Sequence, residues 1–237
     1  MNYFLIITIA IIIILLYILW KYFSNTGTNL VKNTNLNIVQ STPIPINNTS
    51  VQYAYGVWVY VNSWKQDTPS GPKKTIFSRS NNSSKWDDVG NYTTCLYLDP
   101  VSPTLYLDIA QNGTTSNTPI TISTNFPIQK WCYVAFSVNN QYVDCYLDGK
   151  LVKSVYLQKT ITTPALKDAV YIGSSTTVND IYINSFYHWA NPLTPQQVWS
   201  NYLNGNGTSP MAALSNSFGF GFAFYKNNVE TSTYRLF

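Results

Sequence analysis

Ionisable side chains are scarce in this sequence of 237 residues, of which only 10% are charged. There is a single histidine, His188, and a single glutamate, Glu230. A lone histidine among aromatic residues is more often packed or surface-exposed than a general base, so we expect no histidine-based nucleophilic site. One glutamate also excludes any chemistry that requires a pair of them.

Arginine is equally rare, with two residues in the chain, Arg79 and Arg235. The formal net charge of +4 comes from lysines that are scattered along the sequence. Proteins that bind nucleic acid usually carry a concentrated basic patch or stripe. We therefore expect no nucleic-acid partner.

The sequence has three cysteines, Cys95, Cys132 and Cys145, which is an odd number without a Cys-x-x-Cys spacing. Such residues are expected to be small buried hydrophobes without a disulfide, and this favours a reducing compartment.

Metal ligands are also sparse. Asp87 with Asp88, or Asp180, could supply oxygens, but calcium needs about six to eight of them. We predict no metal site and no cofactor.

One long apolar run is present at the start of the chain, "IITIAIIIILLYILWKYF", residues 6–23. Residues 3–20 contain no charge, and as an α-helix they would extend about 27 Å, close to the hydrocarbon thickness of a bilayer. A signal peptide would have a basic start, a shorter apolar core and a small-residue cleavage site. Here the start is not basic, the apolar run is longer, and there is no such cleavage site. Residues 1–23 are therefore predicted to be a single, uncleaved transmembrane anchor, with residues 3–20 in contact with lipid.

The end of this run has the composition of a membrane interface. Trp20, Lys21 and Tyr22 combine two amphipathic aromatic rings with a cation that can reach the headgroups. Lys21 and Lys32 are the nearby cations, and both follow the apolar run, so the positive-inside tendency keeps the C-terminal side in the cytosol.

The remainder of the chain has the composition of an all-β protein. Aromatic residues make up 16% of the sequence, with 19 Tyr and 7 Trp, and they occur with Val, Ile and Thr in short runs. Residues 24–50 are rich in Asn, Thr, Ser and Pro and are predicted to be a polar spacer. Residues 51–237 are predicted to form one folded domain.

Alternation along the chain predicts the strands and their buried faces. In "QYAYGVWVYV", residues 52–61, the odd-numbered positions from Tyr53 to Val61 share one face. A two-residue loop at Asn139 and Asn140 would place the apolar residues of the next hairpin on one face. Its predicted pairs are Phe136 with Val143, Val134 with Cys145, and Cys132 with Leu147. Asp148 and Gly149 predict a second tight turn.

A short helix and a hairpin are predicted near the C-terminus. Thr194 as N-cap, Pro195 and Gln197 have the spacing of a capping box, and Gly205 can end the helix. Its predicted apolar face consists of Val198, Tyr202 and Leu203. Residues 216–237 are predicted to form a hairpin that turns at residues 226–228.

The hairpin from Trp131 to Val152, with "WCYVAF" followed by "YLDGKLV", resembles the signature hairpin of the concanavalin A-like lectin and laminin G-like superfamily. Neighbouring segments occur in the order that this superfamily uses: "YAYGVWVYVNSW", "TIFSRS", "AVYIGSS" and "INSFYHWANPLTPQQVWSNYLNG". The resemblance spans about residues 51–205. It implies a two-sheet antiparallel jelly-roll sandwich that includes the one short helix.

This superfamily includes hydrolases, lectins and structural modules, so the resemblance leaves the function open. The Glu-x-Asp-x-x-Glu strand of its glucan hydrolases cannot be placed in a chain with one glutamate, and we expect no enzyme activity. Asp99, Asp108, Asp144 and Asp148 are expected in turns or on outward-facing strand positions. Residues expected near loops, where they could contact a glycan or a protein partner, are Trp64, Trp86 and Trp189.

An N-terminal anchor, a spacer and such a sandwich together resemble the membrane-anchored minor capsid proteins of large icosahedral double-stranded DNA viruses. This resemblance implies a non-enzymatic structural protein that tethers the internal virion membrane to the capsid shell. The sandwich would face the capsid, on the cytosolic side during assembly, and its partners would be the major and other minor capsid proteins. The alternative prediction is a membrane-anchored lectin-like adhesion protein that binds a glycan.

Overall fold

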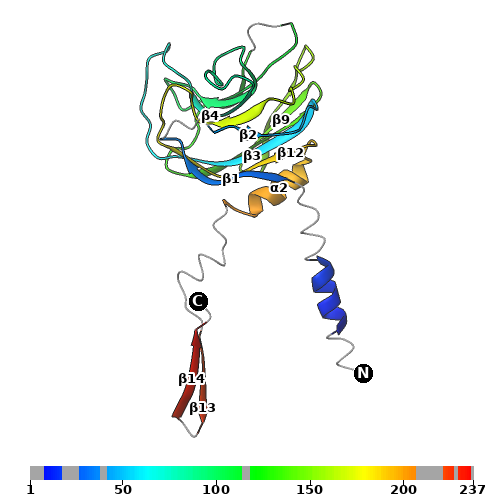
Figure 1. Ribbon diagram of the computed structural model, residues 1–237, viewed down its shortest axis with the longest axis vertical. Helices are drawn as coiled ribbons and strands as arrows, with labels where there is room; N and C mark the ends of the chain where they lie inside the picture. The colour runs from blue at the N-terminus through cyan, green and yellow to red at the C-terminus, as the bar shows by residue number, and fades with distance from the viewer. Residues whose placement is uncertain are drawn as a thin grey trace.

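The computed structural model describes residues 8–17, 27–37, 42–113, 118–206, 221–226 and 229–235. Its main feature is a pair of six-stranded antiparallel sheets that stack face to face (Figure 1). The β3 sheet has the strand order β1(Thr28–Asn35), β12(Ile181–Trp189), β3(Gln52–Val61), β8(Trp131–Asn139), β9(Tyr142–Leu147) and β10(Lys150–Tyr156). The β4 sheet has the order β2(Ile44–Pro45), β11(Ala169–Ile172), β4(Lys74–Ser80), β5(Tyr92–Leu98), β6(Leu105–Ile109) and β7(Ile120–Ser123). The predicted all-β sandwich is confirmed.

The core lies between the two sheets and follows the predicted alternation. On β3, the side chains from Tyr53 to Val61 at odd positions belong to this core. Ala54 and Trp58 belong to a second apolar cluster, on the opposite face of the same strand. Because successive side chains of a strand point to opposite faces, β3 is covered on both sides.

The hairpin of β8 and β9 has the predicted faces but a different register. The observed pairs are Val138 with Val143, Phe136 with Cys145 and Val134 with Leu147, so the loop consists of residues 140 and 141. Asn140 takes the positive φ of this loop, at 55°. The predicted pairs differ by two residues, and a shift of two leaves each side chain on its original face. The turn at residues 148 and 149 is confirmed, with positive φ at both positions.

The predicted spacer differs most from the structure. Strand β1 pairs with β12, and β2 pairs with β11, so parts of residues 24–50 belong to the two sheets. Leu36 is 1% exposed and its backbone N–H donates to the carbonyl of Ile181 at 2.8 Å. A sheet edge supplies backbone partners that composition alone does not reveal, so a polar segment becomes a strand there.

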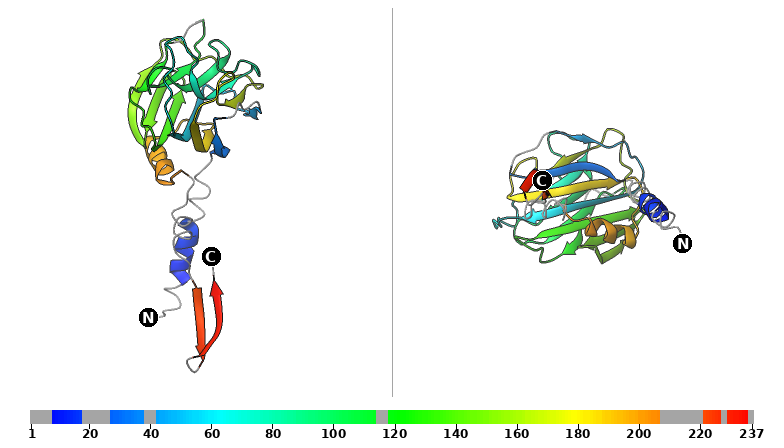
Figure 2. Two further views of the ribbon diagram at one scale, coloured as in Figure 1. Left: turned by 90° about the vertical axis from the view of Figure 1, so that its left-hand side faces the viewer. Right: turned by 90° about the horizontal axis from the view of Figure 1, so that it is seen from below.

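Helix α2(Pro195–Leu203) lies on the side of the β3 sheet that faces away from the β4 sheet (Figures 1 and 2). Its predicted capping box is confirmed, because the Thr194 hydroxyl accepts from the Gln197 backbone N–H and the Gln197 side chain accepts from the Thr194 N–H. Val198 is buried and Tyr202 packs against the sheet. Leu203 is 64% exposed, which corrects its predicted place on the buried face.

At the two ends of the chain, the structure describes only part of what the sequence predicts. Residues 8–17 are helical. The other residues of the predicted 3–20 span, and the predicted interface residues Trp20, Lys21 and Tyr22, lie outside the described residues. Within the described part of the chain, no helix combines the length and the apolar character needed to cross a membrane.

The predicted C-terminal hairpin is present as β13(Gly221–Lys226) and β14(Val229–Arg235). These two strands form a two-stranded sheet of their own, whereas the predicted domain of residues 51–237 included them in the sandwich. Residues 227 and 228 of the predicted turn lie outside the described residues.

Candidate ligand-binding cleft at the rim of the sandwich

A cleft of about 550 Å³ lies where β3 ends, β4 begins and β12 begins. Its walls come from the loop of residues 63–72, from segment 176–180 and from the side chains of Asn37 and Lys74. Three backbone hydrogen bonds join these segments: Asn62 N to Asp180 O (3.0 Å), Leu36 N to Ile181 O (2.8 Å) and Asn179 N to Leu36 O (3.1 Å). We call this site the rim cleft.

Asp180 is a fixed hydrogen-bond acceptor in the rim cleft. Its Oδ2 accepts from the Ser63 hydroxyl at 2.6 Å and from Asn62 Nδ2 at 2.7 Å, and its Oδ1 accepts from Asn37 Nδ2 at 3.2 Å. The hydrogen bond from Ser63, followed by those from Asn62 and Asn37, lowers the pKa of Asp180. The carboxylate is therefore ionised at neutral pH.

Two further polar groups of the rim cleft have unused bonding capacity. Asn179 Nδ2 and Thr177 Oγ1 are buried and have no hydrogen-bond partner among the described residues. Both residues line the cleft. Because an unpaired buried polar group costs about 1–3 kcal/mol, these atoms favour a polar ligand.

Trp64 and Lys74 form the apolar and cationic part of the same wall. Trp64 is half-buried and packs against the edge of the core. The Nζ atom of Lys74 lies 5.1 Å from the centroid of the Trp64 ring, which is within cation–π distance. Lys74 is 8% exposed, and burial lowers its pKa. Trp64, predicted as a contact residue, is thus placed beside charged groups that the sequence did not associate with it.

Trp86 and Trp189, the other two predicted contact residues, are buried elsewhere. Trp86 is 3% exposed, stacks on Tyr171 with ring centroids 5.0 Å apart, and donates from Nε1 to the Gly173 carbonyl at 2.9 Å. This burial argues against its predicted contact role. Trp189 lies on the outer face of the β3 sheet, stacked on Tyr187 at 5.7 Å. It borders a pocket of about 120 Å³ beside α2.

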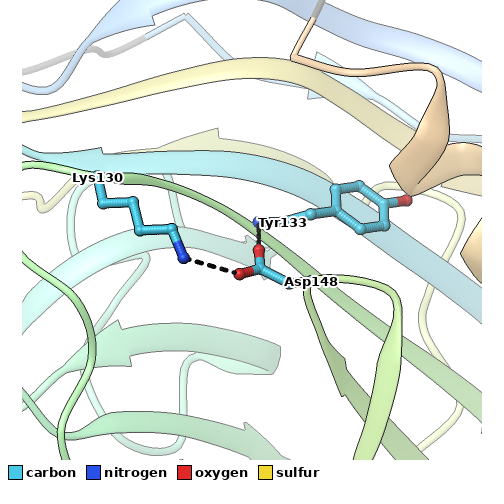
Figure 3. A network of polar contacts seen from close by, with 3 residues as sticks. All are labelled: Lys130, Tyr133 and Asp148. Atoms are coloured by element: carbon cyan, nitrogen blue, oxygen red, sulfur yellow. Dashed lines mark hydrogen bonds and ion pairs between the residues drawn. The ribbon is translucent and has the colours of Figure 1, made fainter.

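The four aspartates that were predicted in turns or on outward-facing strand positions have structural partners, and Asp108 and Asp144 lie within β6 and β9. Asp148 Oδ1 accepts from the Tyr133 backbone N–H at 2.9 Å, and its Oδ2 lies 3.5 Å from Lys130 Nζ (Figure 3). Figure 3 also shows the Tyr133 ring directed away from this carboxylate. The other three are hydrogen-bonded as follows: Asp99 to Val101 N, Asp108 to the Tyr92 hydroxyl and Asp144 to the Ser154 hydroxyl. These contacts hold turns and neighbouring strands together.

The described residues contain no group of three or more His, Cys, Asp or Glu side chains that could hold a metal ion. The three cysteines are free and buried, and burial raises the pKa of Cys132 to about 11 and that of Cys145 to about 12. These thiols are therefore protonated at neutral pH, and they contribute to packing as the sequence predicts.

Comparison with known proteins is consistent with this architecture. A family model described as the concanavalin A-like lectin/glucanases superfamily matches residues 33–199, which is more than half of the chain. A search of curated proteins found no match. The similar solved structures include the binding domain of botulinum neurotoxin serotype G and a Trypanosoma rangeli sialidase in complex with 2,3-difluorosialic acid.

The neurotoxin domain is 16% identical, with a TM-score of 0.49, and the match covers 73% of this chain and 38% of that one. The sialidase is 11% identical, with a TM-score of 0.47, and the match covers 67% of this chain and 24% of that one. This chain thus matches well under half the length of either structure, and neither bears on what it binds. The match to the family model over residues 33–199 shows that the chain belongs to the concanavalin A-like lectin and glucanase superfamily.

Proposed function

We propose that this protein is a carbohydrate-binding module and that the rim cleft is its ligand site. The observation that carries the proposal is the Trp64 indole in one cleft with the ionised Asp180 and the unpaired Nδ2 of Asn179. Ligand sites typically combine an apolar wall with a few fixed polar groups. Membership of a superfamily that contains lectins supports the same reading.

Each part of the cleft matches one feature of a sugar. The C–H face of a pyranose ring packs on the Trp64 indole, because both surfaces are flat and apolar. Asp180 accepts hydrogen bonds from ring hydroxyls, and such bonds to an ionised group are stronger than neutral ones. Asn179 and Thr177 supply donors. A volume of about 550 Å³ falls within the range of about 300–1,000 Å³ that small-molecule sites occupy.

We propose binding without hydrolysis. The carboxylates that line the rim cleft are Asp67 and Asp180. Retaining and inverting hydrolysis both need one carboxyl group whose pKa is raised so that it can protonate the leaving group. The pKa of Asp180 is lowered by its three donors, which is the wrong direction for a general acid.

A glycan array probed with the full chain tests this function, followed by titration of the best ligand against two matched variants. Trp64→Ala should weaken binding by about two- to tenfold, because it removes a stacking surface worth roughly 0.5–1.5 kcal/mol. Trp199→Ala is the control, since Trp199 is an exposed tryptophan on α2, outside the cleft. An array without signal at high protein concentration, or equal losses for the two variants, would contradict the proposal.

A second candidate is a membrane-tethered structural protein that joins an internal virion membrane to capsid proteins. The helical residues 8–17 favour it, because apolar side chains such as Ile13 and Leu16 are each 60% exposed. Protease treatment of intact particles and of particles whose shell has been opened tests this role. Cleavage should begin in the sandwich only after the shell is opened, and absence of the protein from detergent-washed particles would refute it.

A further inference from the structure

Lys74 is a largely buried residue at the wall of the rim cleft, and its Nζ is not among the buried side-chain atoms that lack a partner. Its side chain is 8% exposed at the first position of β4, and it lines the cleft. Among the described residues, no hydrogen-bond acceptor or carboxylate partner contacts its ammonium group, and the one ion pair joins Lys130 to Asp148. The Trp64 ring lies 5.1 Å from Nζ, and the charges of Asp67 and Asp99 also stabilise the ammonium group.

A ring face satisfies only part of the bonding capacity of an ammonium group. The quadrupole of an aromatic ring attracts a cation but accepts no conventional hydrogen bond, and an ammonium has three N–H donors. A carboxylate is the partner that satisfies a partly buried lysine best, through charge-assisted hydrogen bonds. No carboxylate among the described residues is hydrogen-bonded to Lys74, so its ammonium group is available to an incoming anion.

Neither carboxylate of the cleft is hydrogen-bonded to Lys74, although the charge of Asp67 favours its ammonium form. Asp180 accepts from three side chains, and Asp67 Oδ1 accepts from the Thr68 backbone N–H at 2.8 Å. A second cation, Lys65, lines the same cleft and is exposed. The cleft thus offers two ammonium groups to an incoming molecule.

We propose that the rim cleft selects an acidic sugar, with the sugar carboxylate bound at Lys74 and assisted by Lys65. The inference rests on the proposed carbohydrate-binding function and specifies its ligand class. The hydroxyl groups of the same sugar meet Asp180 and Asn179, and its apolar face meets Trp64. The carboxylate replaces the water that an ammonium would otherwise keep, so a neutral sugar in this position leaves Lys74 without its acceptor.

Matched ligands test the selectivity on the unmodified full chain by titration calorimetry. The first pair is a hyaluronan tetrasaccharide and its carboxyl-reduced form, in which glucuronate becomes glucose. The second pair is sialyllactose and lactose. The acidic member of at least one pair should bind about tenfold or more tightly than its neutral partner, and added salt should reduce this difference. Equal affinity within both pairs would overturn the inference.

A charge-removing variant locates the selectivity. Lys74→Met keeps an unbranched stem but removes the ammonium, so it should abolish the preference for the acidic ligand over its neutral partner. Lys85→Met, at an exposed lysine outside the cleft, is the matched control and should keep the preference. If Lys74→Met weakens acidic and neutral ligands equally, Lys74 only shapes the cleft wall, and its assignment as the carboxylate-binding residue is overturned.

The outcomes separate the two proposals. If neutral glycans bind through Trp64 without any acidic preference, carbohydrate binding stands and the anionic subsite is wrong. If no acidic or neutral glycan binds, the proposed function itself fails. A thermal melt of Lys74→Met shows whether the variant is folded, and the matched ligands on the unmodified chain decide the question where it is not.

Discussion

His188, the only histidine of the chain, lies in the aromatic interior and not at the rim cleft. It is 4% exposed, its ring centroid lies 4.9 Å from that of Tyr55, and Asn48 Nδ2 lies 3.5 Å from its Nε2. The fully buried Arg79 is held close by, with its guanidinium donating to the carbonyls of Ile46 and Asn48. Burial, with a further contribution from the Arg79 charge, lowers the pKa of His188 to about 4.

This lowered pKa predicts a loss of stability on acidification. Below pH 6.5 the unfolded chain binds a proton at His188 while the folded chain does not, so the free energy of unfolding falls as the pH falls towards about 4. The full effect is on the order of 3 kcal/mol, at about 1.4 kcal/mol per pKa unit. Urea unfolding between pH 7 and pH 5 measures most of this decrease in the free energy of unfolding. This pH range lies above the one in which carboxylates titrate. His188→Gln should flatten the slope, and an unchanged slope would contradict the assignment.

At the scale of elements, the β9–β10 hairpin and α2 are coupled through one glycine. Gly149 has a φ of 78°, and a Cβ at this position would lie 2.7 Å from Cε3 of Trp199 and 3.1 Å from Cβ of Tyr202. The turn therefore needs a residue without a side chain for two reasons, its backbone conformation and the packing of α2 against it.

Gly149→Ala should destabilise the protein by about 2 kcal/mol or more, from a positive-φ penalty near 1 kcal/mol plus displacement of the two rings. Gly113→Ala is the matched control, because Gly113 has a φ of 69° and a Cβ added there would meet no atom of the described residues within 4 Å. That variant should lose only about 1 kcal/mol. Chemical denaturation of both variants gives the difference, and equal losses would show that the α2 contact adds nothing.

At the scale of the whole molecule, the chain preceding β3 completes both sheets. Strand β1 is the edge strand beside β12, and β2 is the edge strand beside β11. Leu36 and Ile46 add apolar side chains to the core from this region. The sandwich therefore begins before the family resemblance that starts at about residue 51.

A pair of truncated chains tests this boundary. A chain that starts at residue 27 should keep a cooperative thermal transition, whereas one that starts at residue 42 loses β1 and exposes the edge of β12. Loss of Leu36 alone should cost about 2–5 kcal/mol, the range for deleting a large buried aliphatic side chain. Matching melting temperatures for the two chains would show that β1 is dispensable.

Local pattern determined much of the fold. Alternation along β3, the Asp148–Gly149 turn and the capping box from Thr194 to Gln197 each depend on residues close in sequence, and the structure bears them out. The predicted register of β8 and β9 was wrong by two residues, because the faces of a strand repeat every two residues and leave that shift undetermined. The observed loop, in which Asn140 has a positive φ, fixes the register of the two strands.

The candidate site depended on contacts that sequence patterns do not contain. Trp64 was predicted from its place near a loop, but Trp86 satisfied the same rule and is buried against Tyr171. Asp180 and Lys74 are 106 positions apart in the sequence and meet in one cleft. By itself the sequence determined the strands and their buried faces, because those follow from period and turn chemistry, and the family resemblance implied the sandwich. Only the tertiary structure decided which side chains share the rim cleft, because pairing of distant strands brings them together.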